Sequence, residues 1–201
     1  MTVVRSRPVA DAEDPTLLTG AERARRDRLR DPRDRAAYTA AHVLARECVA
    51  ELTGLRPADV VLVQRCPGCG GADHGRPFVA GRDDVHASLS HARAVVAAVA
   101  SFAPCGIDVE ARGDHPAPRG ALSGRERRWV EGQDDPGLAF LQLWVRKEAL
   151  VKCGAGSLAT AARLDVLGDD GPTGACGPFV LREWRDAAAV GAWAVAEHPS
   201  R

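Results

Sequence analysis

Apolar and small residues recur at helical spacing in two long stretches of the chain, residues 33–52 and residues 137–153. The first set is Ala37, Ala40, Ala41, Leu44, Cys48 and Leu52. The second set is Leu138, Leu141, Trp144, Val145 and Val151. Steps of three and four positions put each set on one helical face, so both stretches are predicted to be helices with a buried side. A capping box of Ser123 and Glu126 predicts a shorter helix between them.

Short runs of β-branched and small apolar residues predict the strands. They cover residues 59–64, 85–89, 95–100, 105–110, 163–167, 179–184 and 190–197. Residues 1–19 and the stretch 65–77, which is rich in glycine and proline, are predicted to be irregular. Strands follow one another instead of alternating with helices, which is typical of an α+β fold and not of a doubly wound sheet.

The chain of 201 residues is long enough for one ordinary domain or two small halves. Pro104 marks a midpoint, with a long helix and several strands on either side of it. We therefore expect an N-terminal half of residues 1–103 and a C-terminal half of residues 104–201.

Charge and hydropathy exclude several classes of protein. Lysine plus arginine and aspartate plus glutamate each number 27, so no net charge favours nucleic acid or an anionic membrane. No apolar run is long enough to span a bilayer, and the first residues lack the apolar core of a signal peptide. We expect a soluble cytoplasmic protein, and its six cysteines are then expected to be free thiols.

Two carboxylates stand two positions apart in the predicted strand 105–110. Residues two apart in a strand face the same side, so Asp108 and Glu110 project together while Ile107 and Val109 turn to the core. A hard divalent ion such as Mg²⁺ would hold such a pair through its oxygen atoms. The alternative is an exposed strand face with two solvated acids.

The second long helix carries charge on the stripe that begins at Trp144. Glu148 and Lys152 follow it at intervals of four, and the neighbouring turns are apolar. A buried carboxylate and ammonium are costly unless they are used, although an ordinary ion pair on a solvated face gives the same spacing. The sequence holds 25 arginines but only two lysines, Lys147 and Lys152, which indicates that an ammonium group is required there.

A third group of residues could bind phosphate. Gly75-Arg76-Pro77 is followed by Ser88-Leu89-Ser90-His91, and guanidinium and hydroxyl groups are good donors to phosphate oxygens. Each of these signals is weak alone.

The order of the motifs resembles that of a known family. Gly-Arg-Pro, Ser-Leu-Ser-His, Gly-Ile-Asp-Val-Glu and Trp-x-x-Lys-Glu-Ala-x-x-Lys, between residues 75 and 152, are similar to the motifs of 4′-phosphopantetheinyl transferases of the long, surfactin-synthetase-activating type. The resemblance implies a pseudo-twofold α+β fold of two similar halves, with coenzyme A bound between them. It also implies transfer of phosphopantetheine from coenzyme A to a serine of an apo carrier protein (acyl or peptidyl), with release of adenosine 3′,5′-bisphosphate.

The resemblance implies roles for individual residues. The Mg²⁺ ligands would be Asp108, Glu110 and Glu148, and Glu148 would also draw the proton from the carrier serine. Lys152 would act on the leaving pyrophosphate side. The coenzyme A phosphates would contact a set of side chains in the N-terminal half: Arg33, Arg35, Arg76, Ser90 and His91. Because one chain supplies both halves, a monomer is expected.

Two other functions are compatible with parts of the sequence. Cys66 and Cys69, with His74 nearby, could hold zinc in a zinc-ribbon-like binding module, although such a site needs a fourth ligand. A Mg²⁺-dependent phosphohydrolase could use the same three carboxylates with water as the nucleophile.

Overall fold

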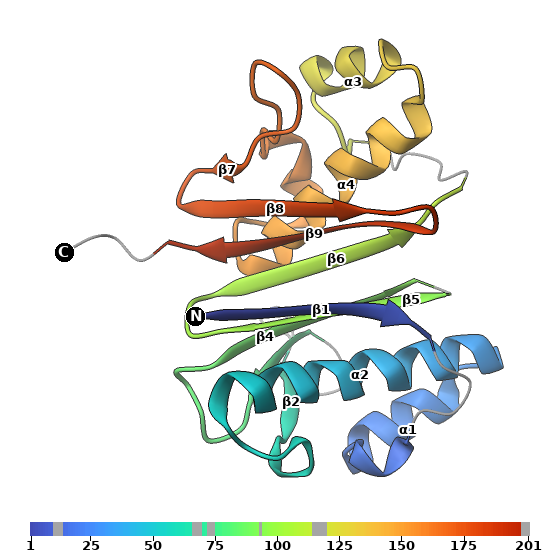
Figure 1. The fold of residues 1–201 in the computed structure, drawn as a ribbon, viewed down its shortest axis with the longest axis vertical. Helices are drawn as coiled ribbons and strands as arrows, with labels where there is room; N and C mark the ends of the chain where they lie inside the picture. The colour runs from blue at the N-terminus through green and yellow to red at the C-terminus, as the bar shows by residue number, and fades with distance from the viewer. Residues whose placement is uncertain (10–13, 66–69, 72–74, 93, 114–119, 198–201) are drawn as a thin grey trace. The chain divides into compact units, whose positions relative to one another are not determined.

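The computed structural model describes residues 1–9, 14–65, 70–71, 75–92, 94–113 and 120–197. In it the chain divides into two compact units, Met1–Pro104 (unit 1) and Cys105–Arg201 (unit 2). The division lies one residue from the boundary expected at Pro104. Each unit combines helices with an antiparallel sheet, so the predicted α+β class is confirmed (Figure 1).

Unit 1 is a five-stranded antiparallel sheet with one long and one short helix. The strand order is β1-β5-β4-β3-β2. The elements are β1 (Thr2–Pro8), α1 (Gly20–Arg28), α2 (Pro32–Thr53), β2 (Leu62–Arg65), β3 (Arg76–Val79), β4 (His86–Ala92) and β5 (Val95–Ser101), with 3₁₀ turns at Pro15–Leu17 and Pro57–Asp59.

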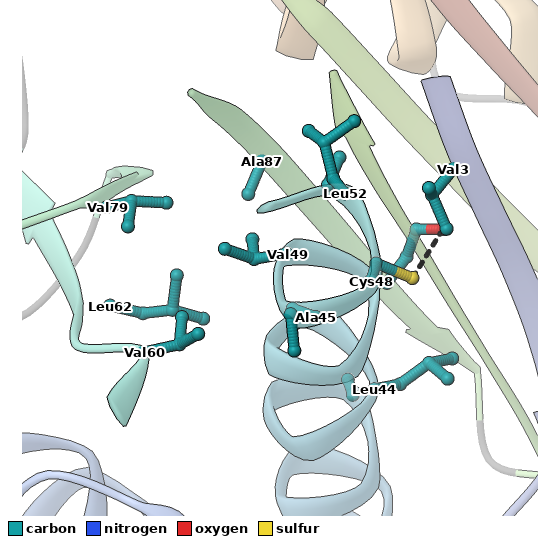
Figure 2. Close-up of a cluster of buried hydrophobic side chains, with 14 of the residues drawn as sticks. Val3, Leu44, Ala45, Cys48, Val49, Leu52, Val60, Leu62, Val79 and Ala87 are labelled. Carbon is teal, nitrogen blue, oxygen red and sulfur yellow. Dashed lines mark hydrogen bonds between the residues drawn. The ribbon is translucent and has the colours of Figure 1, made fainter. Parts of the chain in front are cut away.

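The long helix α2 confirms the helical pattern read from the sequence. Asp31 caps its first turn by accepting a hydrogen bond from the Arg33 N–H (2.8 Å), and Gly54 ends it with a φ of 78°, which favours glycine. Its apolar face packs on the sheet in the cluster of Figure 2, where the Cys48 thiol also donates to the carbonyl of Ala98 (3.7 Å).

Unit 2 is a four-stranded antiparallel sheet in the order β6-β9-β8-β7, with two α-helices. Its elements are β6 (Cys105–Ala111), α3 (Gly124–Glu131), α4 (Pro136–Cys153), a 3₁₀ helix η3 (Leu158–Arg163), β7 (Ala175–Cys176), β8 (Phe179–Arg185) and β9 (Ala189–Ala196). The predicted capping box of Ser123 and Glu126 begins α3.

The two units repeat one topology. Each begins with a strand, continues through a short helix and a long helix, and returns to the first strand through a hairpin. The sheet order β1-β5-β4 in unit 1 corresponds to β6-β9-β8 in unit 2. The two units therefore share an order of elements, while the pseudo-twofold pair of similar halves stays a prediction.

Three predictions of local structure are wrong. The stretch 1–19 is not irregular throughout, because Thr2–Pro8 forms β1, whose arginines hid the strand pattern. Arg76 and Pro77 lie in β3 and not in a loop, since β3 pairs with β2 despite the proline. Residues 163–167 form no strand. There the side chains of Glu126 and Asp165 accept the backbone N–H groups of Val166 (3.4 Å) and Leu167 (3.1 Å) that a strand would pair.

Other sequence expectations meet the structure only in part. No helix in the described ranges is both long and apolar enough to cross a bilayer. Free thiols are found at Cys48, Cys105, Cys153 and Cys176. Cys66, Cys69 and His74, the zinc candidates, lie outside the described residues.

Candidate active site

Strand β6 presents its acidic residues to helix α4. Gly106, Asp108 and Glu110 share one face by strand alternation, and a Cβ atom on Gly106 would lie 2.1 Å from the carbonyl oxygen of Ala149 and 2.5 Å from the nitrogen of Cys153. Glycine therefore allows α4 to lie directly on β6. The sequence analysis missed this residue, although its place two before Asp108 is a signal that could have found it.

An ion pair between Lys152 and Asp108 also joins α4 to β6. Lys152 Nζ lies 2.7 Å from Asp108 Oδ1, and the Asp108 side chain is 6% exposed while that of Lys152 is 30% exposed. The predicted neighbours Ile107 and Val109 are buried on the opposite face of the strand. Asp108 is therefore not one of two solvated acids on an exposed strand face.

Glu148 lies one turn before Lys152 on α4, in the same acidic surroundings. Burial, the charge of Asp108 and the charge of Glu110 raise the pKa of Glu148 to about 7, and Lys152 offsets only part of this. A carboxyl group with this pKa exists in both protonation states near neutral pH, which suits an exchange of protons.

The donor set fits a hard divalent cation by its chemistry. Three carboxylates from β6 and α4 interact through their charges, and oxygen ligands are those that Mg²⁺ prefers. Over the residues that the structure describes, no three His, Cys, Asp or Glu side chains are gathered closely enough to hold a metal ion. Asp108 is instead engaged by the ammonium of Lys152.

The surroundings of Lys147 explain why a lysine, and not an arginine, stands at this position. Its side chain has no exposed surface, and its ammonium group donates to three acceptors: the carbonyls of Ala161 (2.8 Å) and Leu164 (2.7 Å) and the carboxylate of Glu126 (2.9 Å). Three donors meet three acceptors in a closed space, which a planar guanidinium would not fit. Lys147 thereby ties α4, α3 and η3 together beside Glu148.

Unit 1 holds the five residues expected to contact phosphate. Arg33 is exposed on the first turn of α2, and Arg76 is exposed on β3. Arg35 donates to the carbonyls of Leu29 (2.7 Å) and Arg30 (3.2 Å), so part of its guanidinium fixes the link between α1 and α2.

Ser90 and His91 lie inside β4, which extends beyond the strand predicted at residues 85–89. As neighbours in a strand they face opposite sides of the sheet. His91 shares its side with Ala87 and Leu89, which pack toward α2, whereas Ser90 points to the other side. The structure therefore gathers these two residues at one strand end but not on one face.

A cavity of about 210 Å³ in unit 1 adds a residue that the sequence analysis missed. It is lined by Thr19, Ala21, Glu22, Arg25, Tyr38, Leu62, Val63 and Gln64. Tyr38, the one tyrosine of the sequence, is 5% exposed, and its hydroxyl has no hydrogen-bond partner among the described residues. Burial and the charge of Glu22 raise the pKa of Tyr38 to about 12, so the hydroxyl remains a donor at neutral pH.

Comparison with known families bears on unit 2. Residues 104–195 match the model of the 4′-phosphopantetheinyl transferase superfamily. No curated protein matches the chain significantly. The matched segment begins just before β6 and ends in β9, so it contains Asp108, Glu110, Glu148 and Lys152. The similarity of this segment to the superfamily suggests a transferase that acts in phosphopantetheine transfer.

Proposed function

We propose that this protein transfers the 4′-phosphopantetheine arm of coenzyme A to a serine of an apo carrier protein and releases adenosine 3′,5′-bisphosphate. The observation that carries the proposal is the group of three interacting carboxylates beside Lys152, within the segment that matches the superfamily. The long, surfactin-synthetase-activating type is the member of the superfamily that the motif order favours.

In this reaction Mg²⁺ would lower the charge of the pyrophosphate. Asp108, Glu110 and Glu148 are the residues that would hold it. Glu148 would also accept the proton of the carrier serine, directly or through water, as the serine oxygen bonds to phosphorus. Lys152 offers its ammonium to the oxygen of the departing adenosine bisphosphate.

Unit 1 would bind the nucleotide end of coenzyme A. Its candidate ligands are cationic or hydroxyl side chains: Arg33, Arg35, Arg76, Ser90 and His91. The cavity lined by Arg25 and Tyr38 offers a second place on unit 1, with a buried hydroxyl that has no hydrogen-bond partner among the described residues. Charge-assisted hydrogen bonds from guanidinium groups are the strongest means of holding phosphate.

The test is intact-mass spectrometry of apo acyl and peptidyl carrier proteins incubated with coenzyme A, Mg²⁺ and the protein. A mass gain equal to one phosphopantetheine group on a carrier, with adenosine 3′,5′-bisphosphate formed in equal amount, supports the proposal. A Mg²⁺-dependent phosphohydrolase would cleave coenzyme A without a carrier and leave the carrier mass unchanged, which contradicts it. Cytoplasmic location and a monomeric state stay predictions of the same proposal.

A further inference from the structure

We propose that Lys152 is an exchangeable counter-ion of Asp108, and that its release from Asp108 makes binding of a divalent cation and of the pyrophosphate-bearing donor cooperative. The inference rests on the proposed function for the identity of the donor. It concerns a state of the protein before any reaction, in which one ammonium group occupies the carboxylate that the cation needs.

The ion pair is the first observation. Asp108 is buried, and Lys152 Nζ lies 2.7 Å from one of its oxygens. Among the described residues the acids are not gathered into a metal-binding group. Binding of a cation by Asp108, Glu110 and Glu148 weakens the attraction between Asp108 and the ammonium, because a lysine and a divalent cation compete for the same charge.

The two lysines of the chain differ in burial and in their place on α4. Lys147 is fully buried and donates to three acceptors, so it is fixed. Lys152 is 30% exposed and lies in the last turn of α4, next to the Gly154 cap. A flexible four-carbon stem at a helix end can turn toward solvent or toward a bound anion without disturbing the helix.

The charges give the direction of the coupling. Without Lys152, three carboxylates would face one another, which is unfavourable in the absence of a cation. A donor diphosphate offers the ammonium new anionic oxygens, and Asp108 is then released to the cation. Binding of each therefore strengthens binding of the other by the same factor.

The first experiment measures Mg²⁺ affinity by isothermal titration calorimetry at pH 8, with and without coenzyme A and with no carrier present. For the wild-type protein we expect coenzyme A to tighten Mg²⁺ binding by about tenfold, within the usual range of coupling between sites. In Lys152→Met, Mg²⁺ alone should bind about tenfold more tightly than in the wild type, and coenzyme A should tighten Mg²⁺ binding by a smaller factor than in the wild type.

Arg125→Met is the matched control. It removes one positive charge from unit 2, at a side chain that pairs with Asp165 and donates to the carbonyls of Leu167 (3.0 Å) and Gly168 (2.7 Å), and it should leave both Mg²⁺ constants unchanged. Equal Mg²⁺ affinity of Lys152→Met and wild type in the absence of coenzyme A overturns the inference, as does full coupling in the variant. Lys152→Gln repeats the comparison if the methionine variant does not fold.

A second measurement needs no variant. Because the chain has only two lysines, lysine labelled with ¹³C at the ε carbon gives two NMR signals, one of which is a fixed internal reference. Addition of Mg²⁺ and coenzyme A should move the Lys152 signal and leave that of Lys147. An unmoved Lys152 signal, in a protein that transfers phosphopantetheine, overturns the inference without touching the proposed function. If the Lys152 signal moves but no phosphopantetheine is transferred, the proposed function is contradicted and the inference about Lys152 stands.

Discussion

The junction between the first strand and the long helix carries different charges in the two units. In unit 1, Arg5 and Arg7 are the fourth and sixth residues of β1 and pair with Glu51 (2.6 Å) and Glu47 (2.9 Å) on α2. In unit 2, the fourth and sixth residues of β6 are Asp108 and Glu110, and α4 supplies Lys152 and Glu148. One framework thus carries two closed ion pairs in one unit and an excess of acid in the other.

A buried pair fixes which helix positions correspond. In unit 1, Arg46 on α2 pairs with Glu22 (2.6 Å), the capping-box residue of α1. In unit 2, Lys147 on α4 pairs with Glu126, the capping-box residue of α3. In each long helix the cation is followed directly by a glutamate that faces the strand: Glu47 follows Arg46, and Glu148 follows Lys147. The pairs therefore align Glu47 with Glu148, and four residues later Glu51 with Lys152.

With this alignment the difference in net charge comes from one position. The pair of Arg5 and Glu51 becomes the pair of Asp108 and Lys152, with signs exchanged and no change in net charge. At the second pair, Arg7 is replaced by Glu110, so Glu148 faces an acid and not a cation. Unit 1 is neutral at these positions, and unit 2 has a surplus of negative charge that a divalent cation would balance.

The largest effect is expected from the buried anchor of unit 2. Lys147→Met leaves the Glu126 carboxylate buried without its cation, which should lower the free energy of unfolding by about 3–5 kcal/mol. Lys147→Arg should still cost about 1–3 kcal/mol because the closed space holds an ammonium. Urea denaturation measures both. A loss below 1 kcal/mol in Lys147→Met would show that Lys147 is not an anchor.

The positive charge that unit 1 has at Arg7 can be introduced at the corresponding position of unit 2, Glu110. Glu110→Arg should pair with Glu148 as Arg7 pairs with Glu47, so the protein folds but transfer slows at least about a hundredfold, roughly 2.7 kcal/mol in barrier. The matched change in unit 1, Arg7→Glu, should leave the rate near that of the wild type. Initial rates of carrier modification measure both. Normal activity of Glu110→Arg would contradict the role of the acid surplus.

The close approach of α4 to β6 depends on glycine. At the second strand position unit 1 has Val3, while unit 2 has Gly106, where a Cβ atom would collide with Ala149 and Cys153. Gly106→Ala should move the helix and reduce the transfer rate about tenfold, roughly 1.4 kcal/mol in barrier. The rate is compared with that of Val3→Ala, which changes unit 1 at the same place and should keep full activity.

Acidification should affect the units in opposite directions. Burial lowers the pKa of His42 in unit 1 to about 4, so between pH 6.5 and 4 the unfolded state takes up its proton first and unit 1 loses stability. The pKa of Glu148 is raised to about 7, so in Mg²⁺-free protein unit 2 gains stability as pH falls from 7 to 4.5.

Hydrogen exchange followed by mass spectrometry at several pH values, corrected for intrinsic rates, separates the two effects. Protection of α2 should fall on acidification, and that of α4 should rise. In Glu148→Gln the rise in α4 should vanish while the fall in α2 remains. Parallel changes in both helices would contradict the assignment of these groups.

The smallest effect is expected at the exposed pairs of unit 1. The Arg5 and Glu51 side chains are about half exposed, and such pairs contribute less than about 1 kcal/mol. Arg5→Gln should change neither the melting temperature nor the transfer rate appreciably. A large loss of activity would mean that unit 1 takes part in the chemistry through this pair.

Local signals explain what the sequence could predict. The helices α2 and α4 and the strand β6 carry complete periodic patterns with caps or glycine ends, so they were predicted closely. Strand β1 was missed because Arg5 and Arg7 take the positions that face the helix, where apolar residues were sought. In β3 the proline suggested a loop, but pairing with β2 outweighed it.

The site was predictable in part for the same reason. The shared face of Asp108 and Glu110 follows from alternation within one strand, and the stripe of Glu148 and Lys152 follows from helical spacing. That these two elements meet depends on the packing at Gly106, which spacing along the chain does not reveal. The exchange of charge between the pair Arg5–Glu51 of unit 1 and the pair Asp108–Lys152 of unit 2 also depends on knowing which side chains pair in space.

The central claim is that the acid surplus of unit 2, and not the matching junction of unit 1, holds a divalent cation. Crystals grown with coenzyme A and Mn²⁺, which replaces Mg²⁺ at oxygen sites and scatters anomalously, test it directly. We predict one anomalous difference peak within coordination distance of Asp108, Glu110 and Glu148, and none at Glu47 and Glu51. A peak at the unit 1 junction, or an empty unit 2 site with coenzyme A bound, would contradict the account.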